Sequence, residues 1–460
     1  MSNHNHNSNS NELLNISPID GRYRSKTRKL SDYFSEFALF RYRIEVEVKY
    51  FIFMFQKIEG KKLPYNTLES LKELYTKFNL IECETVKEIE RKCNHDVKAV
   101  EYYLIEKFKL LGIYKYSYFI HFGLTSQDIN NTSTTLSIRE FIFDVYIPNL
   151  TEILLDINEK AHFWRDTTIM TRTHGQPAVP STMGKELMVF HYRIKKQFDL
   201  LYEIKYYGKF GGAVGNLNAH YLAYPDINWL GEFEIFCNDT LYLNREKYTT
   251  QIDNYENLAV VFDNLRRINT IFIDMNRDLW QYISMEYLVQ DFSTCEVGSS
   301  TMPQKINPID FENSEGNLMI ANSLLDFMSN KLPISRLQRD LTDSTVLRNL
   351  GTIFGHIEIA FSNFKKGFSK ININPIKIHE DLNSHIEIVT EGIQTLLRRE
   401  GHLDAYDKVK QICRNNEKMS YDKLHQFIQE LEDVSEETKT QLYNLTPSNY
   451  VGACRELVGD

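Results

Sequence analysis

The longest regular pattern of hydrophobic residues occupies residues 256–290, a segment that contains neither Gly nor Pro. Its apolar positions advance by steps of three and four residues: Leu258, Val261, Leu265, Ile268, Phe272, Met275, Leu279 and Tyr282. This spacing lines one side of an α-helix that would run for roughly 50 Å at about 1.5 Å per residue. A helix of that length packs nearly parallel to its neighbours, so the pattern favours a helical bundle, either within one chain or shared between subunits.

A segment that begins at Met183 repeats the same spacing and predicts a second helix. Further helices are predicted over 308–329 and about 352–368. Strand patterns are sparse. The glycine-rich stretch Gly208–Gly215 predicts a turn or a close approach of two backbone segments, and it lacks the frame of a phosphate-binding loop.

These patterns predict an all-α protein with three helical domains. The expected divisions are a disordered tail over 1–15, an N-terminal helical domain over 16–120, a central long-helix bundle over 121–368 and a C-terminal helical domain over 369–460. The tail is rich in Asn, Ser and His and has little apolar surface to bury. A chain of 460 residues is also longer than one compact core usually serves.

Composition narrows the functional classes. The net charge of -9 argues against a nucleic-acid partner, because such a protein needs a basic face. An anionic ligand must therefore be held by a local group of Arg, Lys and His. The six cysteines are scattered and form no C-x-x-C pair, which indicates a reducing compartment. No apolar run of about 18 residues and no signal peptide are present, so we expect a cytoplasmic protein with no membrane partner.

The stretch Glu296–Asn313, EVGSSTMPQKINPIDFEN, allows two interpretations. As the start of a helix, Asn307 would be the N-cap, Pro308 would fit the first helical position and Asp310 would favour the helix dipole. That interpretation leaves Lys305 and the two adjacent serines after a glycine unexplained. A functional loop is the alternative.

The stretch TRTHGQPA places His174 between Thr and Gly, just before Pro177. The conformation of the local backbone therefore fixes the position of this histidine, which does not lie on the face of a helix. Its pKa range suits proton transfer near neutral pH. A histidine that is merely hydrogen-bonded within a turn is the alternative.

Two predicted helix starts carry polar residues of either structural or functional meaning. In Asn94-His95-Asp96, Asn94 or Asp96 would cap a helix, or the helix start with His95 would hold an anion. Thr125 and Ser126 precede Gln-Asp at a second start, where capping is again the structural interpretation.

Two stretches that contain arginine complete the candidates. LQRDLTDSTVLRN concentrates Arg339, Ser344, Thr345 and Arg348, either as salt-bridged surface charge or as a clamp for phosphate or carboxylate. The stretch ISPIDGRY is a rigid turn that presents an arginine and a tyrosine. No HExxH motif and no His/Asp cluster of metal-ligand spacing is present, so we expect neither a metal nor a cofactor.

Taken together, these stretches resemble one family. GSSTMPQKINP is similar to the signature loop of the fumarase/aspartase superfamily, GSSxMPxKxNP. Within it, SPIDGRY, NHDVKAVEYYL, RTHGQPA, YTTQI, NPIDFENSEGN and QRDLTDSTVLRN resemble the adenylosuccinate lyase family, of the kind common in bacteria. The resemblance runs from about Ile16 to the C-terminus.

The resemblance implies an activity: β-elimination of fumarate from adenylosuccinate to give AMP, and from succinyl-aminoimidazole carboxamide ribotide, in purine nucleotide biosynthesis. It implies that Ser299 is the base and His174 the acid. Lys305 would help to deprotonate the serine, and His95 is a further candidate for the acid role. The implied fold has a twenty-helix core in a homotetramer, whose active sites are shared between chains.

The resemblance also implies a set of residues that bind the nucleotide substrate. The expected anion clamp comprises Arg22, Tyr23, His95, Arg339, Ser344 and Arg348. The succinyl part and the nucleotide would be held by Thr125, Ser126, Gln251, Ser300, Lys305, Asn307 and Asn313. Further contacts are expected from Asn94, Asp96, Ile306 and Thr345.

Two other interpretations are tested against this one. A sibling lyase would act on argininosuccinate or aspartate, and the stretch RDLTDSTVLR argues against it. A non-catalytic helical assembly protein would lack the catalytic residues, whereas Ser299, His174 and Lys305 are all present.

Overall fold

The computed structural model describes residues 12–291, 302, 305–413 and 419–459. The chain divides into two compact parts, described separately below. Unit 1 comprises residues 1–150, 197–273 and 313–363, and unit 2 comprises residues 151–196, 274–312 and 364–460. The first eleven residues of the predicted tail, together with Ser299 and Ser300, lie outside the described residues.

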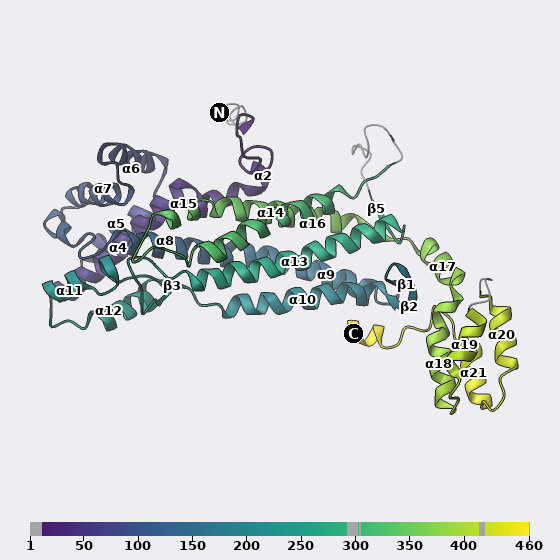
Figure 1. Ribbon diagram of the computed structural model, residues 1–460. Helices are drawn as coiled ribbons and strands as arrows, with labels where there is room; N and C mark the ends of the chain where they lie inside the picture. The colour runs from purple at the N-terminus through teal and green to yellow at the C-terminus, as the bar shows by residue number, and fades with distance from the viewer. Residues whose placement is uncertain (1–11, 292–301, 303–304, 414–418, 460) are drawn as a thin grey trace. The chain divides into compact units, whose positions relative to one another are not determined.

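Helices dominate both units, as predicted (Figure 1). Unit 1 contains α2 (Arg24–Thr27), η1 (Arg28–Leu30), α3 (Ser31–Phe34), α4 (Glu36–Glu59), α5 (Tyr65–Thr76), α6 (Leu80–Cys93), α7 (Asp96–Leu110), η2 (Tyr114–Phe119), α8 (Ser126–Phe141), η3 (Ile142–Tyr146), β3 (Tyr207–Gly208), η4 (Gly212–Val214), α11 (Asn218–Ala223), α12 (Trp229–Ile235), η5 (Phe236–Thr240), β4 (Asn244–Arg245) and α15 (Thr342–Leu347).

Unit 2 adds short strands and shorter helices. It contains β1 (Thr168–Thr173), β2 (Gln176–Thr182), β5 (Leu288–Gln290), β6 (Ile371–Ile373), α17 (Pro375–Ser384), η6 (Ile386–Val389), α18 (Thr390–Arg399), α19 (Ala405–Cys413), α20 (Tyr421–Gln429), α21 (Glu436–Asn444) and α22 (Cys454–Val458). Five long helices contribute residues to both units: α9 (Ile147–Phe163), α10 (Met183–Glu203), α13 (Glu256–Ser284), α14 (Ile309–Lys331) and α16 (Leu350–Lys370).

The predicted long helix is α13, but it ends six residues earlier than the pattern indicated. Glu286 adopts the left-handed conformation with φ 62°. Its N–H bonds to Ile283 O at 3.0 Å, and Tyr287 N–H bonds to Tyr282 O at 2.9 Å. This pair of bonds is a Schellman motif, which closes a helix. The motif usually has Gly at the left-handed position. Because Glu286 occupies that position here, the sequence does not predict that the helix ends at this point.

The other three predicted helices correspond to α10, α14 and α16. The start of α14 differs from the prediction by one residue. The carbonyl of Pro308 accepts bonds from the N–H groups of Phe311 and Glu312 at 3.2 and 3.3 Å. By this bonding pattern Pro308 is the capping position, and Asn307 precedes it.

Within unit 1, α4 forms the centre of the core. Ser35 caps its N-terminus by accepting a bond from the N–H of Ala38 at 3.1 Å. Side chains along the helix are buried, and they include charged ones: Arg43 is 3% exposed, Glu45 7% and Glu47 0%. Charged residues are seldom buried unless they are paired. Arg43 and Glu47 have partners on α7, on α8 and in the segment before α8, whereas Glu45 pairs with Lys49 of α4 itself.

The glycine-rich stretch of unit 1 makes the close backbone approach that its sequence predicted. Gly215 has φ 89°, and a Cβ atom there would lie 2.1 Å from the carbonyl oxygen of Thr249. Tyr207 and Gly208 of β3 pair in parallel with Asn244 and Arg245 of β4. The stretch therefore packs directly against the segment that follows β4.

Unit 2 contains an antiparallel hairpin that the sparse strand patterns did not predict. Strands β1 and β2 pair with Thr173 opposite Gln176, so His174 and Gly175 form a two-residue turn. Both have positive φ, 53° and 75°. This is the geometry of a type I′ turn, in which the second residue is usually Gly. Helices α18 to α21 form a separate apolar cluster of unit 2, around Ile393, Leu424 and Ile428 (Figure 1).

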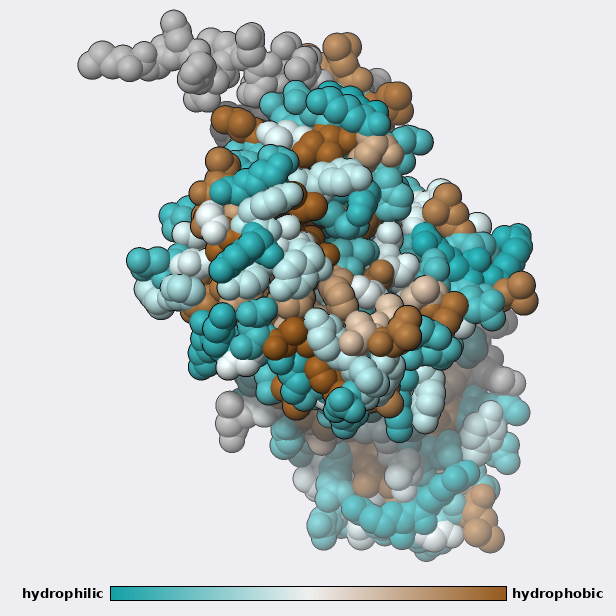
Figure 2. Space-filling view, turned by 90° about the vertical axis from the view of Figure 1, so that its left-hand side faces the viewer, coloured by the Kyte–Doolittle hydropathy of each residue, from teal (hydrophilic) through white to brown (hydrophobic). Residues whose placement is uncertain are grey.

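Hydrophobic side chains in the view of Figure 2 lie scattered among hydrophilic ones, as on most protein surfaces. None of the helices described here combines the length and the apolar character that crossing a membrane requires.

Candidate active site

A cavity of about 530 Å³ opens in unit 1 among α4, the starts of α7 and α8, and the segment around α15. Among the described residues, the predicted site residues that line it are Asn94, His95, Asp96, Ser126, Arg339, Ser344 and Arg348. They come from three stretches far apart in the sequence, which the fold brings to one place.

The first stretch joins α6 to α7. Asn94 takes the left-handed conformation that ends α6, with φ 52°. The cap of α7 is His95, because its Nδ1 accepts a bond from the N–H of Lys98 at 3.1 Å. The prediction that Asn94 or Asp96 caps this helix was therefore wrong. With Nδ1 acting as an acceptor, the Nε2 atom of neutral His95 carries the proton.

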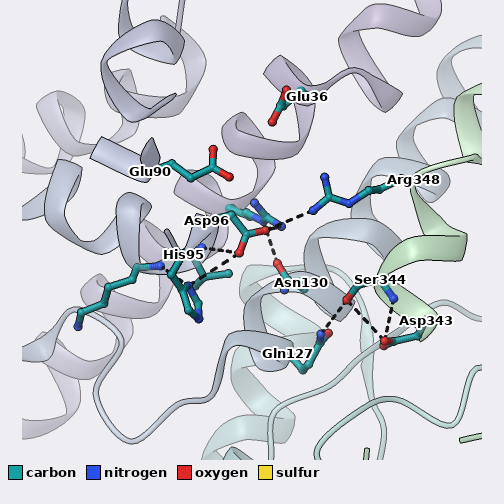
Figure 3. Close-up of polar contacts among 12 residues, drawn as sticks. Glu36, Glu90, His95, Asp96, Gln127, Asn130, Asp343, Ser344 and Arg348 are labelled. Atoms are coloured by element: carbon teal, nitrogen blue, oxygen red, sulfur yellow. Dashed lines mark hydrogen bonds and ion pairs between the residues drawn. The ribbon is translucent and has the colours of Figure 1, made fainter. Parts of the chain in front are cut away.

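Asp96 lies between two arginines (Figure 3). Its Oδ2 accepts a bond from Nη2 of Arg43 at 2.7 Å and lies 3.7 Å from Nη2 of Arg348. Its Oδ1 accepts a bond from the N–H of Val97 at 2.9 Å. Burial acts to raise the pKa of Asp96, but the charge of Arg43 and these hydrogen bonds outweigh it and hold the pKa below its ordinary value. The carboxyl group therefore stays ionised at neutral pH.

The second stretch is the start of α8, which Thr125 caps as predicted. Oδ2 of Asp128 accepts a bond from the N–H of Thr125 at 2.8 Å. Oδ1 of Asp128 accepts a bond from Lys209 Nζ at 2.8 Å, inside a fully buried ion pair. Asp128 thus fixes the first turn of α8 on the side that faces the protein interior, while Ser126 and Gln127 line the cavity.

The third stretch is α15 and its flanks. Asp343 is buried, and its Oδ2 accepts a bond from the hydroxyl of Tyr255 at 2.7 Å. Its Oδ1 accepts a bond from the N–H of Ser344 at 2.7 Å. The hydroxyl of Ser344 lies 3.4 Å from Nε2 of Gln127 (Figure 3). The chain here is anchored on one side and presents polar groups to the cavity on the other.

Arg339 is held by a further predicted residue, Gln251. Nη1 of Arg339 donates to Oε1 of Gln251 at 2.9 Å, and Nε2 of Gln251 donates to the carbonyl of Ala213 at 3.1 Å. The glycine-rich stretch therefore supports Arg339 through Gln251. Thr345 is the residue after Ser344 on α15.

Three predicted residues of unit 1 form a second group. Nδ2 of Asn313 donates to the hydroxyl of Tyr23 at 3.1 Å. Arg22 is exposed, and its guanidinium carbon lies 5.8 Å from the centre of the Tyr23 ring. Asn313 also accepts a bond from Nδ2 of Asn317 at 3.0 Å.

The remaining predicted residues within the described part of the chain belong to unit 2. His174 is exposed at the turn between β1 and β2. Lys305 and Ile306 are exposed and Asn307 is half-buried. The N–H of Lys305 bonds to the carbonyl of Met302 at 3.0 Å.

Comparison with known proteins decides the family. The family model described as "Lyase" matches residues 21–322, and the one described as "Adenylosuccinate lyase C-terminal" matches residues 335–451. Adenylosuccinate lyase of Dictyostelium discoideum is 46% identical to the chain, covering 96% of it and 97% of that protein. The Haemophilus influenzae protein of the same name is 43% identical, covering 97% of this chain and 98% of its own length.

The chain belongs to the adenylosuccinate lyase family. The resemblance expected from the sequence motifs is confirmed, and the chain is a carbon–nitrogen lyase.

Two solved structures have a fold similar to that of this chain. The crystal structure of fumarate lyase from Mesorhizobium sp. BNC1 aligns with a TM-score of 0.74 at 19% identity, covering 94% of this chain and 96% of that one. The 3-carboxy-cis,cis-muconate lactonizing enzyme from Pseudomonas putida aligns with a TM-score of 0.73 at 18% identity, covering 94% and 95%. At such identities the likeness speaks for the fold alone.

Arg43 and Asn130 are among the cavity residues of this lyase that sequence reasoning missed. A signal for Arg43 was present, because the run from Phe37 to Phe55 places charges among aromatic and aliphatic residues without breaking the helix. Such charges are either exposed or paired in the interior. Asn130 offered no signal, because polar residues are common throughout α8.

A half-buried histidine close to the start of α8 leads to a pH prediction. Nδ1 of His121 lies 2.5 Å from Oε1 of Glu47, and its Nε2 lies 4.0 Å from Oε1 of Glu101. Burial alone would lower the pKa of His121, but Glu47, Glu101 and the more distant Asp128 raise it to about 9.

Because this folded-state pKa exceeds the unfolded value, the imidazolium stabilises the fold fully below pH 6.5, and its contribution disappears as the pH rises through about 9. We expect the free energy of unfolding to fall by about 3 kcal/mol across this range. Urea titrations at several pH values measure it. His121→Asn, which tolerates the left-handed φ of 54°, is the control. Parallel pH profiles of the two proteins would contradict the prediction.

Proposed function

We propose that the chain catalyses the β-elimination of fumarate from adenylosuccinate, leaving AMP, and the matching cleavage of succinyl-aminoimidazole carboxamide ribotide. The observation that carries this proposal is the cavity of unit 1, where Arg339, Ser344 and Arg348 converge in a member of the adenylosuccinate lyase family. Its volume of about 530 Å³ lies within the range of small-molecule sites. The net charge of -9 makes such a local group of cations necessary for an anionic nucleotide.

In the proposed mechanism, the alkoxide of Ser299 removes a proton from the carbon next to a carboxylate of the succinyl group. The resulting carbanion is held as an aci-carboxylate, which requires hydrogen-bond donors and positive charge around the oxygens. The C–N bond then breaks, its electron pair moves to the purine nitrogen, and His174 supplies a proton to that nitrogen. Fumarate and AMP leave, so atoms and charge balance without a redox partner.

The remaining residues take binding roles in this proposal. Arg339, Ser344 and Arg348 hold anionic groups of the substrate, together with His95 at the start of α7, where the helix dipole favours negative charge. Lys305 supports the deprotonated Ser299. The type I′ turn fixes the backbone of His174 and leaves its ring exposed to a substrate.

We also propose a cytoplasmic homotetramer of three-domain chains, with a twenty-helix core and shared active sites. The long helices support this proposal, because α10 exposes apolar and aromatic side chains such as Val189 and Tyr192. A sedimentation measurement of the mass in solution would decide between a monomer and a tetramer.

The activity is tested with the purified full-length chain and a panel of substrates. We expect fumarate release from adenylosuccinate, and from succinyl-aminoimidazole carboxamide ribotide, with no metal added and with a chelator present. Argininosuccinate and aspartate should remain uncleaved. Cleavage of either of these in place of adenylosuccinate would reassign the chain to a sibling lyase, and inactivity on all four would support the assembly-protein interpretation.

A further inference from the structure

We propose that Arg43 is a positioning residue: it holds the charge of Asp96, so that the guanidinium of Arg348 remains available to an anionic group of the substrate. The inference rests on the proposed function and deepens it by adding a residue that the family motifs did not indicate. Arg43 acts through its neighbours Asp96 and Asn130, to which it donates hydrogen bonds, and in this proposal it does not itself contact the substrate.

The position of Arg43 is unusual for an arginine. It lies within α4, is only 3% exposed and still lines the cavity. Both of its directional contacts are made inside the protein: Nη2 donates to Oδ2 of Asp96 at 2.7 Å, and Nε donates to Oδ1 of Asn130 at 2.8 Å. Asp96 begins α7 and Asn130 lies in α8, so one side chain joins the two helices whose first turns form the site.

The hydrogen bonds of Asp96 show how its contact with Arg43 affects Arg348. One carboxylate oxygen is taken by the N–H of Val97 and the other by Arg43. Arg348 lies 3.7 Å from the second oxygen, which is ion-pair distance but longer than a hydrogen bond. Its side chain is 59% exposed and lines both the main cavity and an adjoining one of about 300 Å³.

Without Arg43, the partly buried carboxylate of Asp96 would have Arg348 as its cation. A charge that loses its partner in the interior carries a large penalty, so the pair Asp96–Arg348 would tighten. Asp96 and the anionic group of the substrate would then compete for the guanidinium of Arg348. Because this loss affects the bound substrate more than the transfer of protons, it should raise KM more than it lowers kcat.

The test compares Arg43→Met with Lys57→Met in the full-length enzyme. Lys57 lies on the same helix, and its ion pair with Glu232 is on the surface, so this control removes one positive charge from α4 without touching the cavity. Steady-state kinetics on adenylosuccinate should show KM raised about tenfold for Arg43→Met and unchanged for the control. Thermal unfolding is recorded for each variant.

A double-mutant cycle with Asp96→Asn separates positioning from general support. If Arg43 acts by holding the charge of Asp96, the effect of Arg43→Met on KM should shrink severalfold in the Asp96→Asn background. Arg43→Lys keeps the charge but cannot make both contacts, so its KM should fall between those of the wild type and Arg43→Met.

The outcomes are distinct. A folded Arg43→Met with wild-type KM, or an equal effect of Arg43→Met in both backgrounds, would overturn the inference. Should Arg43→Met fail to fold, Arg43→Lys decides: an unchanged KM overturns the inference and a raised KM supports it. If the wild-type enzyme releases no fumarate, the proposed function is wrong, and this result is obtained before any variant is compared.

Discussion

Replacement of Ser299 by Ala should lower kcat for adenylosuccinate by roughly 10²–10⁴-fold, the share that a positioned general base contributes to a proton transfer. The signature GSSTMPQKINP assigns this serine its role by resemblance. A hydroxyl at its ordinary pKa is a poor base, so the proposed mechanism requires a setting that favours the alkoxide, and Ala removes the oxygen atom that would act. His174→Ala should lower kcat similarly for the natural substrate.

The control for this prediction lies two residues away. Thr301→Ala deletes a hydroxyl at a position that the signature pattern leaves open, and it should keep most of the turnover. Fumarate release measured by absorbance compares the variants, and circular dichroism verifies that each one is folded. Ser299→Ala with full activity would remove the base from the mechanism and leave the family assignment intact.

Replacement of Lys209 by Met should cost about 3–5 kcal/mol of unfolding free energy, because it leaves a buried carboxylate without its cation. Lys209 and Asp128 are both fully buried, and burial lowers the pKa of Lys209. Nζ donates to Oδ1 of Asp128 and to the carbonyl of Gly212, both at 2.8 Å. The same Oδ1 accepts a bond from the N–H of Gly211 at 2.9 Å, so the ion pair joins the start of α8 to the glycine-rich stretch.

Two matched variants interpret the result. Lys205→Met removes an exposed lysine four residues earlier and should change the unfolding free energy by under about 0.5 kcal/mol. The double variant Lys209→Met with Asp128→Asn removes both charges and should lose less stability than Lys209→Met alone. Guanidinium titrations measure all three. If Lys209→Met is as stable as the wild type, the ion pair does not hold this part of unit 1 together.

The predictions for His121, Arg43 and Lys209 all concern charge placed in the interior, which sets the geometry of a site. Arg43, Glu47 and Lys209 are all buried, and each is paired with a group in or beside the segments that begin α7 and α8. Buried pairs are weak evidence for stability in themselves. Their directional hydrogen bonds do fix the positions of the helix starts that line the cavity.

The sequence by itself determined the all-helical class, the start of α10 and the family. Helical periodicity is a local property that residues three and four positions apart express without any partner, and the signature loop is a contiguous string of letters. The capping of α8 by Thr125 could likewise be predicted from the sequence, since a cap depends on a few neighbouring residues.

Only the tertiary structure decided which charges serve the site. Arg43 meets Asp96 across 53 positions of sequence and Asn130 across 87, and no local pattern encodes such pairs. The same holds for the end of α13 at Ser284, after which a non-glycine residue, Glu286, takes the left-handed conformation. Local sequence sets which segments become helices, whereas burial and long-range hydrogen bonding select where they end and which of their polar side chains face one another, because those energies exist only once the chain has packed.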